Sequence, residues 1–184
     1  GAGQVGVLQL LMDLGAAFDV RDRLGNYPLH VAASQGQKDA IVFLLSKGAD
    51  IKARNRRRQT ALHEAVSADI QALMRNRWQP QGKEQLSLLE QYAAVMDVLL
   101  EHGAEINAKG LNGMSPLHSA ATAGNAYLAD RLVQKGADID ARDAFGQTPL
   151  FYAIEQENIP TTELLIRRGA DISVRDTFLR VPLH

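Results

Sequence analysis

A short motif recurs along the chain at a fixed period, and this recurrence constrains the fold more than any other feature. The glycines of five related segments, LGAAF, KGADI, HGAEI, KGADI and RGADI, fall at positions 15, 48, 103, 136 and 169. A second series, YPLH, TALH, SPLH, TPLF and VPLH, begins at positions 27, 60, 115, 148 and 181. Both series advance in steps of 33, 55, 33 and 33 residues. We therefore expect repeats of 33 residues, one of which carries an insertion of 22 residues.

Each repeat carries signals for two helices and a connecting loop. Thr or Ser at the start of the second motif can cap a helix with its hydroxyl, and the proline that follows suits the first helical position. Apolar residues then recur at helical spacing, as at Leu128, Leu132 and Val133. The glycine of the first motif can end the second helix. One such unit cannot bury its apolar face alone, so stability must come from stacking.

At these residues the chain resembles the ankyrin repeat family, whose period is 33 and whose signature is T-P-L-H-x-A. The resemblance covers about residues 3–184 apart from the insertion. It implies an all-α ankyrin-repeat solenoid of stacked helix-turn-helix units with hairpin-like fingers, in which one repeat has lengthened helices. Both ends of the sequence fall within a repeat, so we expect a fragment of a longer protein.

The two series also predict how this single solenoid, residues 1–184, is divided. A half repeat spans 3–26, full repeats begin at 27, 60, 115 and 148, and a stub begins at 181. The insertion falls roughly within residues 69–91, in the repeat that begins at 60. Apolar residues keep helical spacing on both of its sides, and Pro80 and Gly82 interrupt it. We interpret it as a helical hairpin.

The sequence offers no chemistry for catalysis. The opening GAGQVG fits a dinucleotide fingerprint, but such a motif follows a strand, and the repeat register makes Gly3 a turn between two helices. The chain has no cysteine, and it contains no P-loop or nucleophile-elbow motif. Four histidines share one repeat position, and packed helices lie too far apart for these rings to bind one metal ion. We expect structural imidazoles, no enzyme activity, no cofactor and no metal.

Composition limits the partners. Hydrophobic residues make up 46% of the chain, charged residues 22%, and the formal net charge is -1. This balance is typical of a soluble globular protein and provides no bulk attraction to nucleic acid or membranes. No apolar run reaches the length of a membrane span, and no signal peptide opens the sequence. We expect an intracellular protein, cytoplasmic or nuclear, that is monomeric as a fragment.

The resemblance implies that a protein or peptide partner meets the finger tips and the exposed ends of the first helices. The segment KARNRRR, residues 52–58, has five cations in seven residues, and Arg58 replaces a turn glycine. It is either a solvated loop or a site for an acidic peptide or phosphate. Phe145 and Phe178 share one tip position and either form a hot spot or pack on the next finger. The predicted partner-binding residues are Arg23, Leu24, Arg54, Arg56, Arg57, Arg58, Leu111, Asn112, Phe145, Phe178 and Trp78. The residues at the exposed ends of the first helices, which we also expect to meet the partner, are Ser34, Gln35, Ser67, Thr122, Ala123, Glu155 and Gln156.

Several interpretations stay open. Trp78 either contacts a partner or closes the small core of the inserted hairpin. Leu179 replaces another turn glycine, which predicts an irregular last finger. A basic residue recurs before each finger tip, at positions 21, 54, 109, 142 and 175, and we expect it to pair with neighbouring Asp residues. Asn107 is similar to finger asparagines that are hydroxylated in this family.

The function predicted from the sequence is a non-catalytic module that presents a concave surface to a partner protein. Two alternatives remain. The chain could be an accessory or regulatory domain of a larger enzyme, channel or transcription regulator. It could also bind an anion or nucleic acid through residues 52–58, although one finger is small for a duplex footprint.

Overall fold

The computed structural model describes residue 6 and residues 19–68 and 83–182. In these ranges it contains α-helices and one short 3-10 helix, and no strand. The first helices of the repeats are α2 (Pro28–Ser34), α4 (Ala61–Val66), α7 (Pro116–Thr122) and α9 (Pro149–Glu155). The second helices are α3 (Lys38–Ser46), α6 (Lys83–Glu101), α8 (Ala126–Gln134) and α10 (Ile159–Arg167), and the 3-10 helix η1 is Leu111–Gly113.

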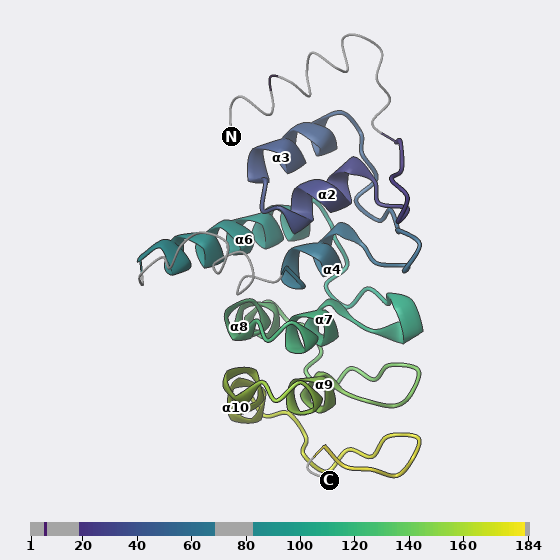
Figure 1. Ribbon diagram of the computed structural model, residues 1–184, viewed down its shortest axis with the longest axis vertical. Helices are drawn as coiled ribbons and strands as arrows, with labels where there is room; N and C mark the ends of the chain where they lie inside the picture. The colour runs from purple at the N-terminus through teal and green to yellow at the C-terminus, as the bar shows by residue number, and fades with distance from the viewer. Residues whose placement is uncertain (1–5, 7–18, 69–82, 183–184) are drawn as a thin grey trace.

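The helices stack in two layers, as the repeat predicted. Each first helix packs on the next, α2 on α4, α4 on α7 and α7 on α9, and each lies against the second helix of its own repeat (Figure 1). Residues at the same repeat position form the hydrophobic core in each helix. The leucine of the second motif is buried in every described copy, and so is one leucine of each second helix: Leu29, Leu62, Leu117 and Leu150, then Leu44, Leu99, Leu132 and Leu165. Burial of these leucines between repeats holds the stack together.

A ladder of histidines joins successive repeats. In each of three copies the ring nitrogen Nε2 lies 2.9–3.1 Å from a main-chain carbonyl oxygen at the base of the next loop, and Nδ1 lies 3.1–3.3 Å from the backbone nitrogen that precedes its own helix. A carbonyl oxygen only accepts, so Nε2 carries the proton and Nδ1 accepts. The pairs are His30 with Gln59, His63 with Met114, and His118 with Gln147.

The long helix α6 includes the return side of the inserted segment, residues 83–91, and it contacts the preceding repeat as well as its own. The Tyr92 hydroxyl donates to the carbonyl oxygen of Ser34 at 2.7 Å, and the Gln91 amide donates to that of Gly36 at 2.9 Å. Gly36 has φ +67°, and a Cβ there would lie 2.9 Å from the Gln91 amide nitrogen. A glycine at this position therefore lets α6 approach the end of α2. The outgoing side of the insertion, with Trp78, lies outside the described residues.

The loops between helix pairs project from one side of the stack (Figure 1). We call them fingers 1 to 5, which are residues 19–26, 47–59, 102–114, 135–147 and 168–180. Backbone hydrogen bonds join the tips of neighbouring fingers in three places: Arg56 N to Leu24 O at 3.2 Å, Ala144 N to Asn112 O at 2.7 Å, and Thr177 N to Phe145 O at 2.9 Å.

Candidate functional site: the finger tips

One carboxylate or amide oxygen fixes the shape of most finger tips. In finger 4, Asp143 Oδ1 accepts the backbone N–H groups of Phe145 and Gln147, both at 2.9 Å. Asp22, Asn55 and Asp176 do the same in fingers 1, 2 and 5, at 2.8–3.0 Å. Side chains at the tip are therefore held on an ordered backbone, which reduces the entropy lost when a partner binds.

Finger 3 departs from this pattern. Glycine occupies the equivalent position, Gly110, and the tip is the 3-10 helix η1 with Asn112 at φ 52°. A Cβ on Gly110 would lie 3.1 Å from Nε2 of His63, so the histidine ladder leaves little room for a side chain there. Among the backbone–backbone hydrogen bonds of the described residues, none joins the tip of finger 2 to the tip of finger 3. Backbone hydrogen bonds thus join the tips in two groups, fingers 1 and 2 and fingers 3 to 5, and side chains of finger 2 reach from one group to the other.

Finger 2 concentrates positive charge, with six basic residues and one acidic residue in 47–59. Three of the cations bind within the protein. Lys52 Nζ lies 3.3 Å from Oε1 of Glu105 in finger 3. Arg54 donates to the carbonyl oxygens of Arg58 and Lys109, and Arg56 donates to that of Arg23 at 2.6 Å. These guanidinium groups link neighbouring fingers.

Arg57 and Arg58 differ from the other cations of the segment. Both residues are exposed, and neither guanidinium has a hydrogen bond or ion pair in the part of the chain that the structure describes. Arg57 lies near the half-buried carboxyl of Glu64, whose pKa is raised chiefly by burial and lowered by the Asn55 amide and the charge of Arg57. Among its described residues, the structure therefore leaves two exposed guanidinium groups without a hydrogen bond or ion pair at one tip, next to finger 1 with its exposed Arg23.

The recurring basic residue binds main chain rather than Asp. Arg54 donates to Lys109 O, Lys109 donates to Arg142 O at 2.9 Å, and Arg142 donates to Arg175 O. The expected pairing with neighbouring Asp residues is therefore wrong for these three cations. The Asp carboxylates instead accept hydrogen bonds from backbone N–H groups of their own fingers. The cations therefore donate to carbonyl oxygens of the next finger.

At the position of the turn glycine, two fingers hold a non-glycine residue in the left-handed region. Arg58 has φ 57° and Leu179 has φ 61°, where fingers 1, 3 and 4 have Gly25, Gly113 and Gly146. The expected irregular last finger is not found, because finger 5 keeps the bonds Asp176 N to Arg180 O and Leu179 N to Asp176 O, both at 3.0 Å. The finger imposes its conformation on Leu179, at a cost of about 1 kcal/mol or more for an L-residue.

The tips of the other fingers expose apolar side chains. Phe145 is 43% exposed, Phe178 is 68% exposed and Leu111 is 47% exposed. The guanidinium carbon of Arg180 lies 5.3 Å from the centre of the Phe178 ring, and Arg180 also pairs with Asp176. Leu24 of finger 1 is 62% exposed and adjoins Arg23. Apolar groups therefore dominate the tips of fingers 3 to 5, and charge dominates the tip of finger 2.

A groove of about 610 Å³ runs from the bases of fingers 2 and 3 to the ends of the first helices. Three of the helix-end positions expected to meet a partner, Ser67, Thr122 and Ala123, line it together. Most of its lining residues are small or carry a short polar side chain. The remaining lining residues are Gln59, Met114, Ser119, Gly124, Asn158 and Pro160.

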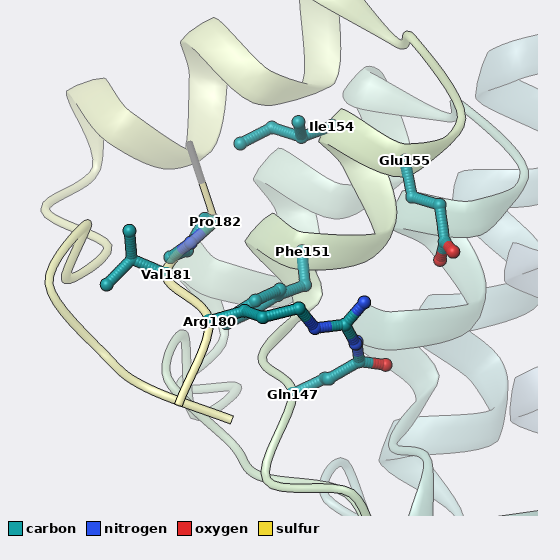
Figure 2. A pocket seen from close by; sticks show the side chains of 7 residues that line it. All are labelled: Gln147, Phe151, Ile154, Glu155, Arg180, Val181 and Pro182. Carbon is teal, nitrogen blue, oxygen red and sulfur yellow. The ribbon is translucent and has the colours of Figure 1, made fainter. Parts of the chain in front are cut away.

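The histidine ladder stops at α9, where Phe151 replaces the histidine. The Oγ1 atom of Thr148, equivalent to the Thr60 and Ser115 hydroxyls that lie 2.8–2.9 Å from a histidine Nδ1, is buried without a hydrogen-bond partner. A hollow of about 160 Å³ lies between α9 and the segment after finger 5 (Figure 2). Figure 2 shows the seven side chains around it: Gln147, Phe151, Ile154, Glu155, Arg180, Val181 and Pro182.

Asn107 lies at the start of finger 3 and is exposed. Its side-chain oxygen accepts the backbone N–H of Asp138 in the next finger at 3.0 Å. Asp140 accepts from Asp171 N at 2.9 Å in the same way, so this position joins successive fingers. Within residues 19–68 and 83–182, no three His, Asp or Glu side chains gather as a metal site, and no helix has the length and apolarity to cross a membrane.

Comparison with known proteins agrees with this architecture. The family model of ankyrin repeats (three copies) matches residues 1–76 and 86–176, and the unmatched residues between them fall inside the predicted insertion. Alpha-latroinsectotoxin-Lt1a of Latrodectus tredecimguttatus is 30% identical over 129 residues, which are 69% of this chain and 7% of the toxin. Human NF-kappa-B inhibitor zeta is 33% identical over 141 residues, 69% of this chain and 19% of the inhibitor.

Neurogenic locus notch homolog protein 1 of Mus musculus is 35% identical over 116 residues, 56% of this chain and 5% of the mouse protein. The chain therefore spans well under two thirds of the length of each of these relatives.

Proposed function

The chain belongs to the ankyrin repeat family, and from this premise we propose that its finger tips, with the adjoining groove, bind a partner protein that carries an acidic segment. Ankyrin repeats are protein–protein interaction modules. The proposal specifies which surface of this chain binds the partner and which kind of partner segment this surface prefers. The acidic segment lies against finger 2, where Arg57 and Arg58 supply charge-assisted hydrogen bonds.

One observation carries this proposal: the guanidinium groups of Arg57 and Arg58 have no hydrogen bond or ion pair among the described residues, although every other cation of the segment 52–58 has one. Arg58 also occupies a left-handed position at which glycine would be easier to accommodate. Unbonded guanidinium groups on an ordered backbone favour a carboxylate ligand, because their donors are available and little loop entropy remains to be lost.

We propose that the module acts without catalysis and inside the cell. The tip residues are arginine, leucine, asparagine and phenylalanine, which are suited to contact rather than to proton transfer or nucleophilic attack. Arg23, Leu24, Arg54 and Arg56 support the surface, the first two as exposed tip residues and the last two by linking fingers. Nucleic acid is a weaker candidate, because the free charge is confined to one finger.

The test compares three forms of the 184-residue chain in a pull-down with quantitative mass spectrometry. The tip variant carries Arg57→Ala, Phe145→Ala and Phe178→Ala. The outer variant carries Arg167→Ala, Val42→Ala and Ile166→Ala, which truncate one cation and two exposed apolar residues on α3 and α10. We expect the outer variant to capture the wild-type set of proteins and the tip variant to lose most of it.

Thermal unfolding and circular dichroism of both variants check that they remain folded. Equal capture by the tip variant and the wild type would contradict the proposal. A Trp78→Ala variant reports separately on the contribution of Trp78.

A further inference from the structure

The finger tips differ in chemistry along the stack, and the difference coincides with a break in the backbone hydrogen bonds between them. Fingers 1 and 2 are joined by Arg56 N and Leu24 O, and finger 2 carries the free guanidinium groups. Fingers 4 and 5 are joined by Thr177 N and Phe145 O, and both present an exposed phenylalanine. Finger 3, which presents Leu111 and Asn112, is joined to finger 4 by Ala144 N and Asn112 O and, among the described residues, has no backbone hydrogen bond to the tip of finger 2.

The charges around the two phenylalanines do not duplicate the basic site. Arg142 donates to the carbonyl oxygen of Arg175, and Arg180 pairs with Asp176 at 2.7 Å. Finger 4 also contains Asp138, Asp140 and Asp143, so its local charge is not positive. An acidic segment therefore gains most at finger 2, and an apolar segment gains most at fingers 4 and 5.

We propose that the tips form a two-part site for a single extended peptide segment, with acidic side chains at Arg57 and Arg58 and large apolar side chains at Phe145 and Phe178. This inference rests on the proposed function and specifies its ligand. Guanidinium groups bind carboxylates through paired donors, and the exposed rings bury aromatic or aliphatic side chains.

The stack fixes the separation of the two parts. Packed helices lie about 8–10 Å apart, so two repeats separate finger 2 from finger 4 by about 16–20 Å. An extended chain advances about 3.3 Å per residue, so the acidic and apolar side chains lie about five or six residues apart in the ligand. Phe178 is one repeat further on, which adds about three residues. The ligand is therefore a linear segment in which the acidic residues and the apolar residues are separated by a spacer, rather than mixed together.

The test is a display selection of random peptides of about 16 residues against the 184-residue chain, followed by affinity measurement of the enriched peptides. We expect enriched sequences to contain two or more acidic residues and, about five to nine residues away, one or two large apolar residues. Arg57→Glu with Arg58→Glu weakens binding by about tenfold or more and removes its salt dependence. Phe145→Ala with Phe178→Ala weakens binding by a similar factor and leaves the salt dependence in place.

The matched control for charge is Lys38→Glu with Arg167→Glu. These substitutions change the net charge by the same amount as the finger 2 variant but lie on α3 and α10, so we expect the affinity to stay within about twofold of the wild type. Enriched peptides that lack acidic residues, or that bind equally well when the spacer is shortened to two residues, overturn the two-part site. If acidic peptides with the shortened spacer still lose affinity for the tip variant, the proposed function stands, whereas peptides that lack acidic residues also overturn its acidic segment. Equal binding of the enriched peptides to the wild type, the tip variant and the outer variant overturns both the two-part site and the proposed function. Selective binding of oligonucleotides at finger 2 also overturns the two-part site, because the ligand would then be a nucleic acid and not a peptide.

Discussion

The imidazole of His63 binds the chain of the following repeat: its Nε2 lies 3.1 Å from the carbonyl oxygen of Met114, 51 residues further along. Its Nδ1 lies 2.9 Å from the Thr60 hydroxyl and 3.2 Å from the Thr60 backbone nitrogen. One neutral ring therefore joins two repeats across the inserted segment. The same contacts at His30 and His118 make the neutral imidazole a repeated structural element.

The His63 contact predicts that acid weakens the fold. The pKa of His63 is lowered to about 4 from 6.5, mainly because burial disfavours the charged ring. Below pH 6.5 the unfolded chain binds a proton that the folded chain does not, so stability is present above this pH and is lost as the pH falls towards 4. The loss from His63 alone is about 3 kcal/mol. Urea unfolding at about pH 7 and about pH 4.5 measures it.

Replacing His63 by Gln separates this effect from the titration of other groups. The variant is less stable at neutral pH, because the Met114 carbonyl and the Thr60 donors lose their partner, but its stability changes less with pH. If the variant and the wild type show the same difference in free energy of unfolding between the two pH values, the attribution to His63 is wrong.

The interrupted ladder predicts opposite outcomes for two threonines. Thr60 Oγ1 has a histidine partner, so Thr60→Val costs about 1–2 kcal/mol of stability. Thr148 Oγ1 is buried without a partner, so Thr148→Val is neutral or stabilising. Valine keeps the branched shape in both cases, so each variant controls for the other. Equal destabilisation in urea unfolding would contradict the assignment.

Much of this architecture is predictable from the sequence. The two motif series predicted the stack, its helix starts near positions 27, 60, 115 and 148, and the structural histidines, because each depends on residues within one repeat. The replacement of turn glycines also identified Arg58 and Leu179 as unusual residues. The left-handed φ values of both agree with that interpretation.

The partners of the cations could not be predicted from the sequence. The segment 52–58 reads as five equivalent charges, and only the approach of fingers 1 and 3 distinguishes Arg54 and Arg56, which bind carbonyl oxygens, from Arg57 and Arg58, which bind none. The anchoring of α6 on α2 is likewise a contact between residues more than 50 positions apart. Local periodicity carries no information on such contacts.

The strained position of Arg58 predicts a stabilising substitution. Arg58→Gly relieves a left-handed conformation and raises stability by about 0.5–1 kcal/mol after the entropy cost of glycine in the unfolded chain. The neighbouring Arg57 does not have a positive φ, so Arg57→Gly lowers stability. Both substitutions remove one cation from the same tip. Equal shifts of the urea midpoint in the two variants would show that strain at Arg58 is not released.

The anchor of α6 predicts a specific loss. Tyr92 is 1% exposed and its hydroxyl donates to the Ser34 carbonyl at 2.7 Å, so Tyr92→Phe costs about 1 kcal/mol. Tyr127 on α8 is the control, because its hydroxyl has no hydrogen bond within the described ranges and Tyr127→Phe leaves stability within about 0.5 kcal/mol. Chemical denaturation measures both. A neutral Tyr92→Phe would mean that the hydroxyl does not hold α6 to α2.

A double-mutant cycle between the finger tips and an enriched peptide tests the central claim most directly. Arg57 and Phe145 are each replaced by Ala, and so are one acidic and one apolar residue of the peptide, and the four coupling energies are obtained from dissociation constants. We predict coupling of about 1 kcal/mol or more between Arg57 and the acidic residue and between Phe145 and the apolar residue, with values near zero for the crossed pairs. Crossed pairs that couple as strongly as matched pairs, or four values near zero, would contradict the account.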